Sequence, residues 1–242
     1  MKIQYASLLM LLAGLKLSMA QQNFFNVPSS DITVKNKIFF QEQLNFSSEI
    51  QSNSTVSYGL GNDAEVGVNL FNLYHNYKQF VVEHQHDPFY PYMAINGQKK
   101  IHLFNTITIA LGTQVGIAPF KNAHWGTYTY LNSVHEIAHF KLVIGTYYGS
   151  KAFVGDEACN DWFGNIDFLS RMGLQTGIER NLWKNRLILQ ADYISGKHSV
   201  SNSVIGLAYA INQRWIVSGG YQRNPYQHTN AAIFELTYIP RK

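Results

Sequence analysis

Alternation of apolar with small or polar residues runs through most of this chain and restricts what it can fold into. In "TITIALGTQVGIA" (106–118) one parity holds Ile107, Ile109, Leu111, Val115 and Ile117. The other parity of this segment holds Thr, Ala, Gly and Gln, so the period indicates a strand with two different faces. The same division recurs in residues 171–179, 204–212 and, less cleanly, 231–239. The chain is therefore predicted to be all-β.

Strand-like segments follow one another between Val34 and Ile239, separated by turn signals such as Gly61-Asn62-Asp63 and Asn224-Pro225. This succession favours an antiparallel up-and-down meander. If the meander closes into a bacterial single-chain barrel, its number of strands must be even, so we expect ten or twelve strands. Eleven segments can be counted, near residues 33–46, 53–60, 63–74, 100–117, 123–134, 138–149, 165–180, 185–195, 200–211, 214–223 and 230–240.

Two architectures fit such a meander: a soluble sandwich with the apolar face in its core, and a transmembrane barrel with that face in lipid. Several segments reach ten or more residues, which favours membrane strands of ~9 to 11 residues over soluble strands of ~5 to 6. Aromatic residues near segment ends predict the girdles of a membrane barrel. These are Tyr128, Tyr130, Tyr147, Tyr148, Tyr193, Trp215 and Tyr221. We predict a transmembrane β-barrel of about twelve strands.

The start of the chain predicts export. Residues 1–20 resemble a secretory signal peptide, with Lys2, an apolar stretch and a small-x-small site at Ser18-Met19-Ala20. Residues 21–242 are then one barrel domain. No stretch approaches the roughly 18 to 20 apolar residues of a spanning helix. The lone cysteine, Cys159, excludes an intramolecular disulfide.

The charge indicates no nucleic-acid partner, and no phosphate-binding loop, catalytic triad order or cysteine pair supports a cofactor. Aromatic and charged residues each make up 14% of the chain, and 18 glycines stand against 6 prolines, which suits a β protein. The net charge of +4 falls by two with Lys2 and Lys16 of the signal, and the remaining basic residues are scattered.

Two stretches carry a resemblance to a known family. "SYGLGNDAEVGVNL" (57–70) contains a Y-G-L-x-x-x-x-E-x-G hairpin, and the segment 187–225 contains the A-D-Y-x-S-G hairpin "ADYISG". Both resemble hairpins of small porin-like outer-membrane β-barrel transporters of Gram-negative bacteria. The resemblance implies a barrel in the outer membrane, with membrane lipid, the assembly machinery and a small solute as partners.

The polar parity of the strands supplies candidates for lining the lumen. Their mixed charges could fill a narrow barrel with hydrogen bonds as readily as line a selective pore, because a barrel of this size has little interior width. The candidates are Lys35, Lys37, Gln41, Gln43, Asn45, Lys141, Arg171, Gln175, Glu179 and Glu235.

One motif suggests a different class of protein. His135-Glu136-Ile137-Ala138-His139 fits the zinc-protease pattern H-E-x-x-H, with Glu136 as base and Glu157 as a third metal ligand. The pattern needs a helix, whereas "FKLVIGTYYGS" (140–150) alternates like a strand. On a strand the two histidines would lie ~13 Å apart, too far to share one zinc ion.

The leading hypothesis is a non-enzymatic outer-membrane barrel that passes small solutes, like a porin, or has a structural role in the envelope. The alternatives are a secreted zinc metallopeptidase that uses His135, His139 and Glu157, and a soluble periplasmic β-sandwich that binds a ligand.

Overall fold

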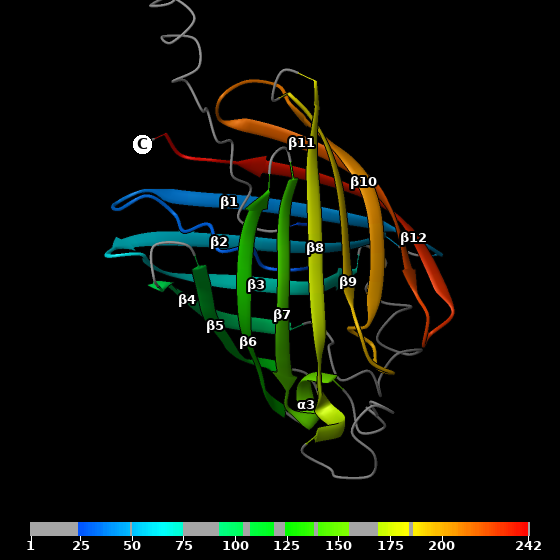
Figure 1. Cartoon of the computed structure of the whole chain (residues 1–242). Coiled ribbons are helices and arrows are strands. Elements are labelled where there is room, and N and C mark those ends of the chain that lie inside the picture. The colour runs from blue at the N-terminus through cyan, green and yellow to red at the C-terminus, as the bar shows by residue number, and fades with distance from the viewer. Residues whose placement is uncertain are drawn as a thin grey trace, which may run out of the picture.

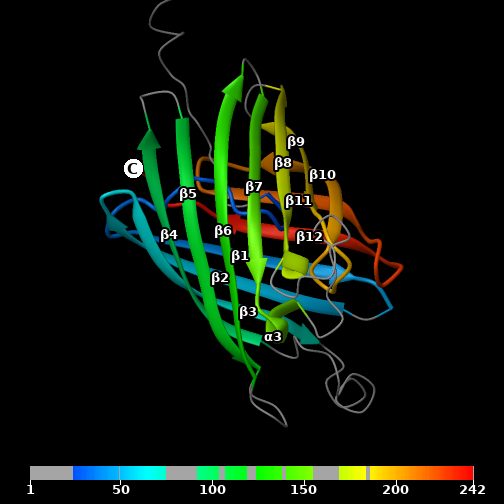
Figure 2. The ribbon, with the colours of Figure 1, turned by 60° about the horizontal axis from the view of Figure 1, so that its bottom comes forward.

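The computed structural model describes residues 24–48, 50–74, 92–103, 107–118, 124–137, 140–154, 169–183 and 186–241. Twelve strands close into one antiparallel barrel, in which each strand pairs with its sequence neighbours and β1 pairs with β12 (Figures 1 and 2). They are β1 (Ile38–Phe46), β2 (Ile50–Gly61), β3 (Ala64–Tyr74), β4 (Tyr92–Leu103), β5 (Ile107–Ala118), β6 (His124–Ile137), β7 (Phe140–Gly149), β8 (Met172–Trp183), β9 (Leu187–Ile194), β10 (Asn202–Ala210), β11 (Trp215–Asn224) and β12 (Thr229–Tyr238). The predicted up-and-down barrel is confirmed.

The segment counted from the sequence as one strand at 100–117 contains parts of two strands. β4 ends at Leu103 and β5 begins at Ile107, and the two pair antiparallel over their length. The polar run Gln98-Lys99-Lys100 interrupts the apolar period of β4, so the pattern hides this strand. Its recovery brings the eleven counted segments to twelve.

The apolar parity of the strands faces outward. In β5, Leu111 and Val115 are exposed, whereas Ala110 is fully buried. Ile95 on β4 and Trp125 on β6 are 70% and 69% exposed. A closed barrel leaves no unpaired strand edge, and an apolar outer surface is stable against lipid rather than water. The outer surface is therefore that of a barrel that spans a membrane, and not that of a soluble sandwich.

Aromatic side chains flank this apolar band at both of its ends, but they are only partly the predicted ones. Among the outward-facing aromatics, Trp125, Tyr193 and Tyr221 lie toward one end, and Tyr58, Trp183 and Tyr209 lie toward the other. The prediction was wrong for Tyr128, Tyr130 and Tyr147, which are buried inside the barrel. Their parity on β6 and β7 is that of the lumen face, so nearness to a strand end did not determine their direction.

The two ends of the barrel differ in the length of their connections. At the turn end, connections of two to four residues join the strands, at 62–63, 104–106, 138–139, 184–186 and 211–214. Asn62 and Asp63 both have positive φ, 51° and 57°, as a two-residue hairpin turn requires. At the loop end, the connections are 47–49, 75–91, 119–123, 150–171, 195–201 and 225–228.

Short helical elements belong to the loop end. The connection between β7 and β8 contains α3 (Lys151–Val154) and η1 (Leu169–Arg171). Figure 1 shows α3 at the end of the barrel away from the C-terminus. Within the described ranges, no helix is long and apolar enough to cross a membrane.

Candidate functional site

Residues 24–34, here called the plug, lie inside the barrel. Phe24, Phe25 and Val27 are almost completely buried. A Cβ atom at Gly177 of β8 would lie 2.7 Å from the ring of Phe24, and one at Gly206 of β10 would lie 2.6 Å from the ring of Phe25. Glycines on the inward face thus leave the space that the two phenylalanine rings fill.

Two inward-facing carboxylates bind the backbone of the plug. Asp192 on β9 accepts hydrogen bonds from the amide nitrogens of Asn26, at 2.7 Å, and Val27, at 3.3 Å. Glu65 on β3 accepts from the amide nitrogen and the hydroxyl of Thr33, at 2.7 and 2.6 Å. Both carboxylates belong to the hairpin motifs in the sequence, which therefore position the plug in this chain.

Two side-chain amides and an ion pair complete the attachment of the plug. Asn132 on β6 donates to the carbonyl of Pro28 at 2.7 Å, and Gln98 on β4 donates to the carbonyl of Ser29 at 2.9 Å. Lys141 on β7 forms a salt bridge with Asp31 and lies 5.8 Å from the ring centre of Phe24. Breaking a buried ion pair by removing one partner costs about 3–5 kcal/mol. These contacts fasten the plug to β3, β4, β6, β7 and β9, and the side-chain amide of Asn26 also donates to Asn202 on β10 and Gln222 on β11, at 3.4 and 3.3 Å.

The plug separates two cavities. The larger one, of about 610 Å³, reaches from Phe25, Asn26 and Pro28 to residues at the loop end, and we call it the vestibule. The smaller one, of about 240 Å³, is lined by Ser30 and Asp31 together with Lys100, Glu136 and Lys141, among others. The plug therefore forms the floor of the vestibule and stands between it and the turn end.

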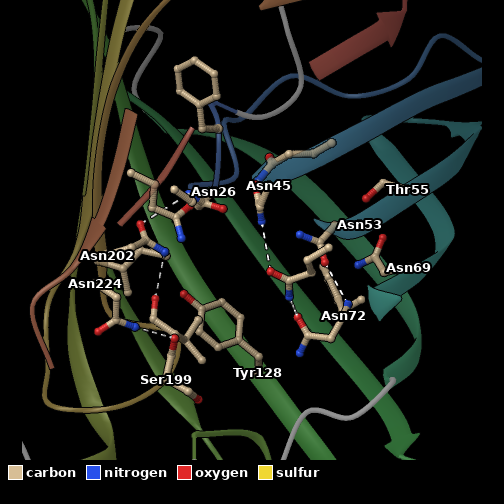
Figure 3. Close-up of a pocket in the computed structure, with 18 of the residues that line it drawn as sticks. Asn26, Asn45, Asn53, Thr55, Asn69, Asn72, Tyr128, Ser199, Asn202 and Asn224 are labelled. Atoms are coloured by element: carbon tan, nitrogen blue, oxygen red, sulfur yellow. Dashed lines mark hydrogen bonds between the residues drawn. The ribbon is translucent and has the colours of Figure 1, made fainter. Parts of the chain in front are cut away.

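The vestibule is lined mainly by uncharged polar groups (Figure 3). Asn and Gln make up half of its lining: Asn26, Gln41, Gln43, Asn45, Gln51, Asn53, Asn69, Asn72, Asn96, Gln98, Gln114, Asn202, Gln222, Asn224, Gln227 and Asn230. The described part of the lining contains no Lys, Arg or His, and its one carboxylate, Glu65, bonds the plug. Its electrostatic character is that of neutral donors and acceptors.

Part of the vestibule wall is aromatic. Tyr128 and Phe153 line the cavity with ring centres 5.1 Å apart. Phe71 on β3 lines it as well and stacks on Tyr92, with ring centres 6.3 Å apart. In the twelve-strand ring β6, which carries Tyr128, lies opposite β12 and its neighbour β1. The aromatic wall therefore faces amide groups across the lumen.

The sequence-predicted lumen residues fall into different places. Gln41, Gln43 and Asn45 are buried and line the vestibule. Lys141 forms the salt bridge that holds the plug. Gln175 and Glu235 are fully buried inside the barrel. Gln175 accepts a hydrogen bond from Tyr128, and Glu235 accepts hydrogen bonds from Ser218 and Thr237.

The other candidates lie apart from the vestibule. Lys35 and Lys37 are exposed just before β1. The guanidinium of Arg171 lies 5.9 Å from the ring centre of Tyr148, and Glu179 accepts from Gln190 at 3.4 Å. Sequence reasoning missed Glu65 and Asp192 as functional residues, although both stand in the quoted hairpin motifs.

The described part of the H-E-x-x-H motif belongs to a strand. β6 continues to Ile137, so His135 and Glu136 point to opposite faces of the sheet. His135 Nε2 lies 2.9 Å from the hydroxyl of Ser133, and Glu136 lines the smaller cavity. His139 and Glu157 lie outside the described residues. Within the described ranges no group of metal-ligating residues is found, and the zinc-peptidase alternative is not favoured.

A buried histidine at the loop end gives the fold a dependence on pH. His198 lies 2% exposed, with Nε2 2.6 Å from the hydroxyl of Tyr147, and burial lowers its pKa to about 4. The unfolded chain binds this proton near the ordinary histidine pKa of about 6.5. The contribution of neutral His198 is therefore complete above about pH 6.5 and is lost as the pH falls toward 4.

We expect His198→Gln to flatten this dependence. The stability of the wild type should fall by up to roughly 3 kcal/mol between pH 7 and pH 4 from this group, and that of the variant should fall by correspondingly less. Urea unfolding in detergent micelles at the two pH values measures the difference. Equal pH dependence of both proteins would show that His198 is not the group responsible.

Comparison with known proteins concerns the fold alone. None of the family models and none of the curated protein sequences matches the chain. Among solved structures, a KdgM porin is similar with a TM-score of 0.59 and 7% identity, over 84% of this chain and 99% of the other. A KdgM porin in complex with disordered oligogalacturonate has a TM-score of 0.58 at 7% identity, over 84% of this chain and 99% of that one. A NanC porin has a TM-score of 0.54 at 10% identity, over 85% and 100%.

The similarity to porin folds agrees with the architecture of the barrel itself. The barrel is closed, has an apolar outer surface and encloses a polar interior. An outer-membrane location follows from this fold together with that surface, because closed barrels of this type are built for bacterial outer membranes. The chain thus has the fold of the KdgM and NanC porins.

Proposed function

We propose that this protein is a porin-like, non-enzymatic channel for small polar solutes, held closed by its own N-terminal segment. The observation that carries the proposal is a polar cavity that leads from the loop end into a membrane-spanning barrel and ends on the plug. An open lumen and a filled one were both compatible with the sequence. The arrangement combines them, since the vestibule is open and the half beneath it is filled.

The connections support an orientation. Outer-membrane barrels place short turns in the periplasm and longer loops outside the cell. By this rule the turn end is periplasmic and the vestibule opens to the exterior. The chain ahead of Phe24 is then the remainder of the exported N-terminus after removal of residues 1–20. Membrane lipid and the outer-membrane assembly machinery are the partners that such a barrel requires.

The vestibule differs in charge from what a polyanionic solute requires. One similar porin is in complex with oligogalacturonate, a chain of acidic sugars. Pores for anions are lined by rings of Arg or Lys, and the described lining here has neither. We therefore propose that uncharged polar solutes, rather than acidic ones, use this vestibule.

Weakening the plug tests the proposed passage. Asp31→Asn removes the charge that pairs with Lys141, so the plug should leave its closed position more often. Proteoliposomes with this variant should swell several-fold faster than wild-type ones in an isosmotic pentose solution. Asp63→Asn, which changes an exposed carboxylate in the turn between β2 and β3, is the matched control and should match the wild type. Swelling at the rate of empty liposomes for all three proteins would contradict a passage for solutes.

A further inference from the structure

We propose that the vestibule is a binding site for a short, neutral oligosaccharide. This inference rests on the proposed function, because it names the class of solute that the entrance of the channel recognises. Its volume of about 610 Å³ lies within the ~300–1,000 Å³ of small-molecule pockets. The side chains that line the vestibule indicate which class of solute fits it.

The amide groups match hydroxyl-rich ligands. A side-chain amide carries two donors and an acceptor oxygen, and a sugar hydroxyl both donates and accepts. Gln43 donates to Asn45 at 2.9 Å, Asn45 donates to Gln51 at 3.3 Å, and Asn96 donates to Asn69 at 2.7 Å. These bonds fix the amide planes while each amino group keeps a second hydrogen. The wall thus presents ordered donors and acceptors of both kinds.

Two buried polar atoms in the lining point to a ligand independently. Gln114 Oε1 on β5 and Ser199 Oγ in the connection between β9 and β10 have no hydrogen-bond partner among the described residues. Both residues line the vestibule. A buried polar atom without a partner costs about 1–3 kcal/mol. A side-chain rotation that brings either oxygen to the cavity surface, where a ligand hydroxyl can bond it, would remove this cost. One atom belongs to β5 and the other to the connection between β9 and β10, so they mark different parts of the lining.

The aromatic wall suits the apolar face of a sugar ring. The partly buried Phe71 presents ring surface to the cavity, and the rings of Tyr128 and Phe153, each 4% exposed, reach it with a small part of their surface. The hydroxyl of Tyr128 already donates to Gln175 at 2.7 Å. A pyranose ring has carbon-bound hydrogens on its faces and hydroxyls around its edge. Stacked on this wall, it would turn its hydroxyls toward the amides of β1 and β2. Water and salt ions have no apolar face that could stack on an aromatic ring.

The described lining offers no cationic side chain to an acidic sugar. A carboxylate that enters the vestibule meets no Lys or Arg of the described lining and loses water without a charged partner. A neutral sugar meets groups that replace its water hydrogen bonds one for one. The vestibule should therefore prefer a neutral trisaccharide to an acidic one of the same length.

Calorimetric titration of the full-length protein in micelles tests this preference. The probes are neutral trisaccharides of gluco, manno, galacto and xylo configuration, with trigalacturonate as the acidic counterpart. We expect at least one neutral probe to bind and trigalacturonate to bind at least about tenfold more weakly. Asn69→Leu and Phe71→Ala should each weaken the neutral probe about tenfold, as expected for one or two lost contacts. Asn181→Leu, which changes an exposed amide at the turn end of β8, is the control and should bind normally.

A gain-of-function variant tests whether the vestibule wall sets the preference between neutral and acidic saccharides. Asn45→Arg places a cation in the vestibule wall and should shift the preference toward trigalacturonate. Binding of no neutral probe, or binding that is unchanged in Asn69→Leu and Phe71→Ala, would overturn the inference. Solute flux separates it from the proposed function: flux without saccharide binding overturns only the binding site, and binding without flux overturns only the passage.

Discussion

Deletion of residues 24–34 is expected to convert the closed barrel into an open one. The plug separates the vestibule from the smaller cavity, whereas the twelve strands pair with one another without it. Its removal therefore leaves the ring intact and joins the two cavities. In planar bilayers the ion conductance should rise about tenfold or more over the wild type, because ions cross only along a continuous water-filled path.

Two measurements make this result interpretable. Lys37→Ala alters an exposed side chain that follows the plug and should leave the conductance at the wild-type level. A shift in gel mobility between unboiled and boiled samples should show that the deletion variant is still a closed barrel. A variant that shows the mobility shift but conducts no better than the wild type would falsify the closure by the plug.

Arginine in the middle of the outward face is expected to destabilise the barrel in a way that depends on depth. Ile144 lies midway along β7 and is 47% exposed, and Ile137 lies at the turn end of β6 and is 62% exposed. Arg on the lipid face costs about 2–4 kcal/mol at the bilayer midplane and about 0–1 kcal/mol near its surface. Ile144→Arg should therefore lower the free energy of unfolding by a few kcal/mol more than Ile137→Arg.

Urea unfolding in phospholipid vesicles measures both variants under the same conditions. The pair is matched, because the residue removed and the residue introduced are identical and only the depth differs. In a soluble protein an exposed Ile→Arg change is nearly neutral at either position. Equal and small effects would contradict the placement of this surface in lipid.

The direction of most strand residues could be predicted from the sequence because alternation is a local property. Leu207 and Phe234 face outward and Ala208 and Glu235 face inward, as the parity of their segments indicates. The same parity argument did not identify β4 as a separate strand. Gln98 and Lys100 are polar residues on its inward face, and Lys99 adds a charge to its outward face. A period of two is weak evidence where both faces of a strand carry polar groups near its end.

The plug could not be predicted, since what holds it is not local. "FFNVPSSDIT" (24–33) has no strand or helix period, and Asn26 meets Asp192 from the far part of the chain. Only a buried carboxylate on an inward parity, as at Glu65 and Asp192, hints that something in the lumen must donate to it. The amide-lined vestibule is equally non-local, because its walls come together only when β1 meets β12.

The position of Phe24 decides how this protein can be tagged or fused to others. Phe24 is 1% exposed inside the ring and its side chain packs at Gly177, so foreign residues fused directly to Phe24 would begin inside the barrel. A tag fused at Phe24 would therefore disturb the packing of the plug and its hydrogen bonds to Asp192. Arg241, by contrast, is exposed beyond β12 at the turn end. A label placed there lies outside the interior, which makes the C-terminus the better site for reporters and purification handles.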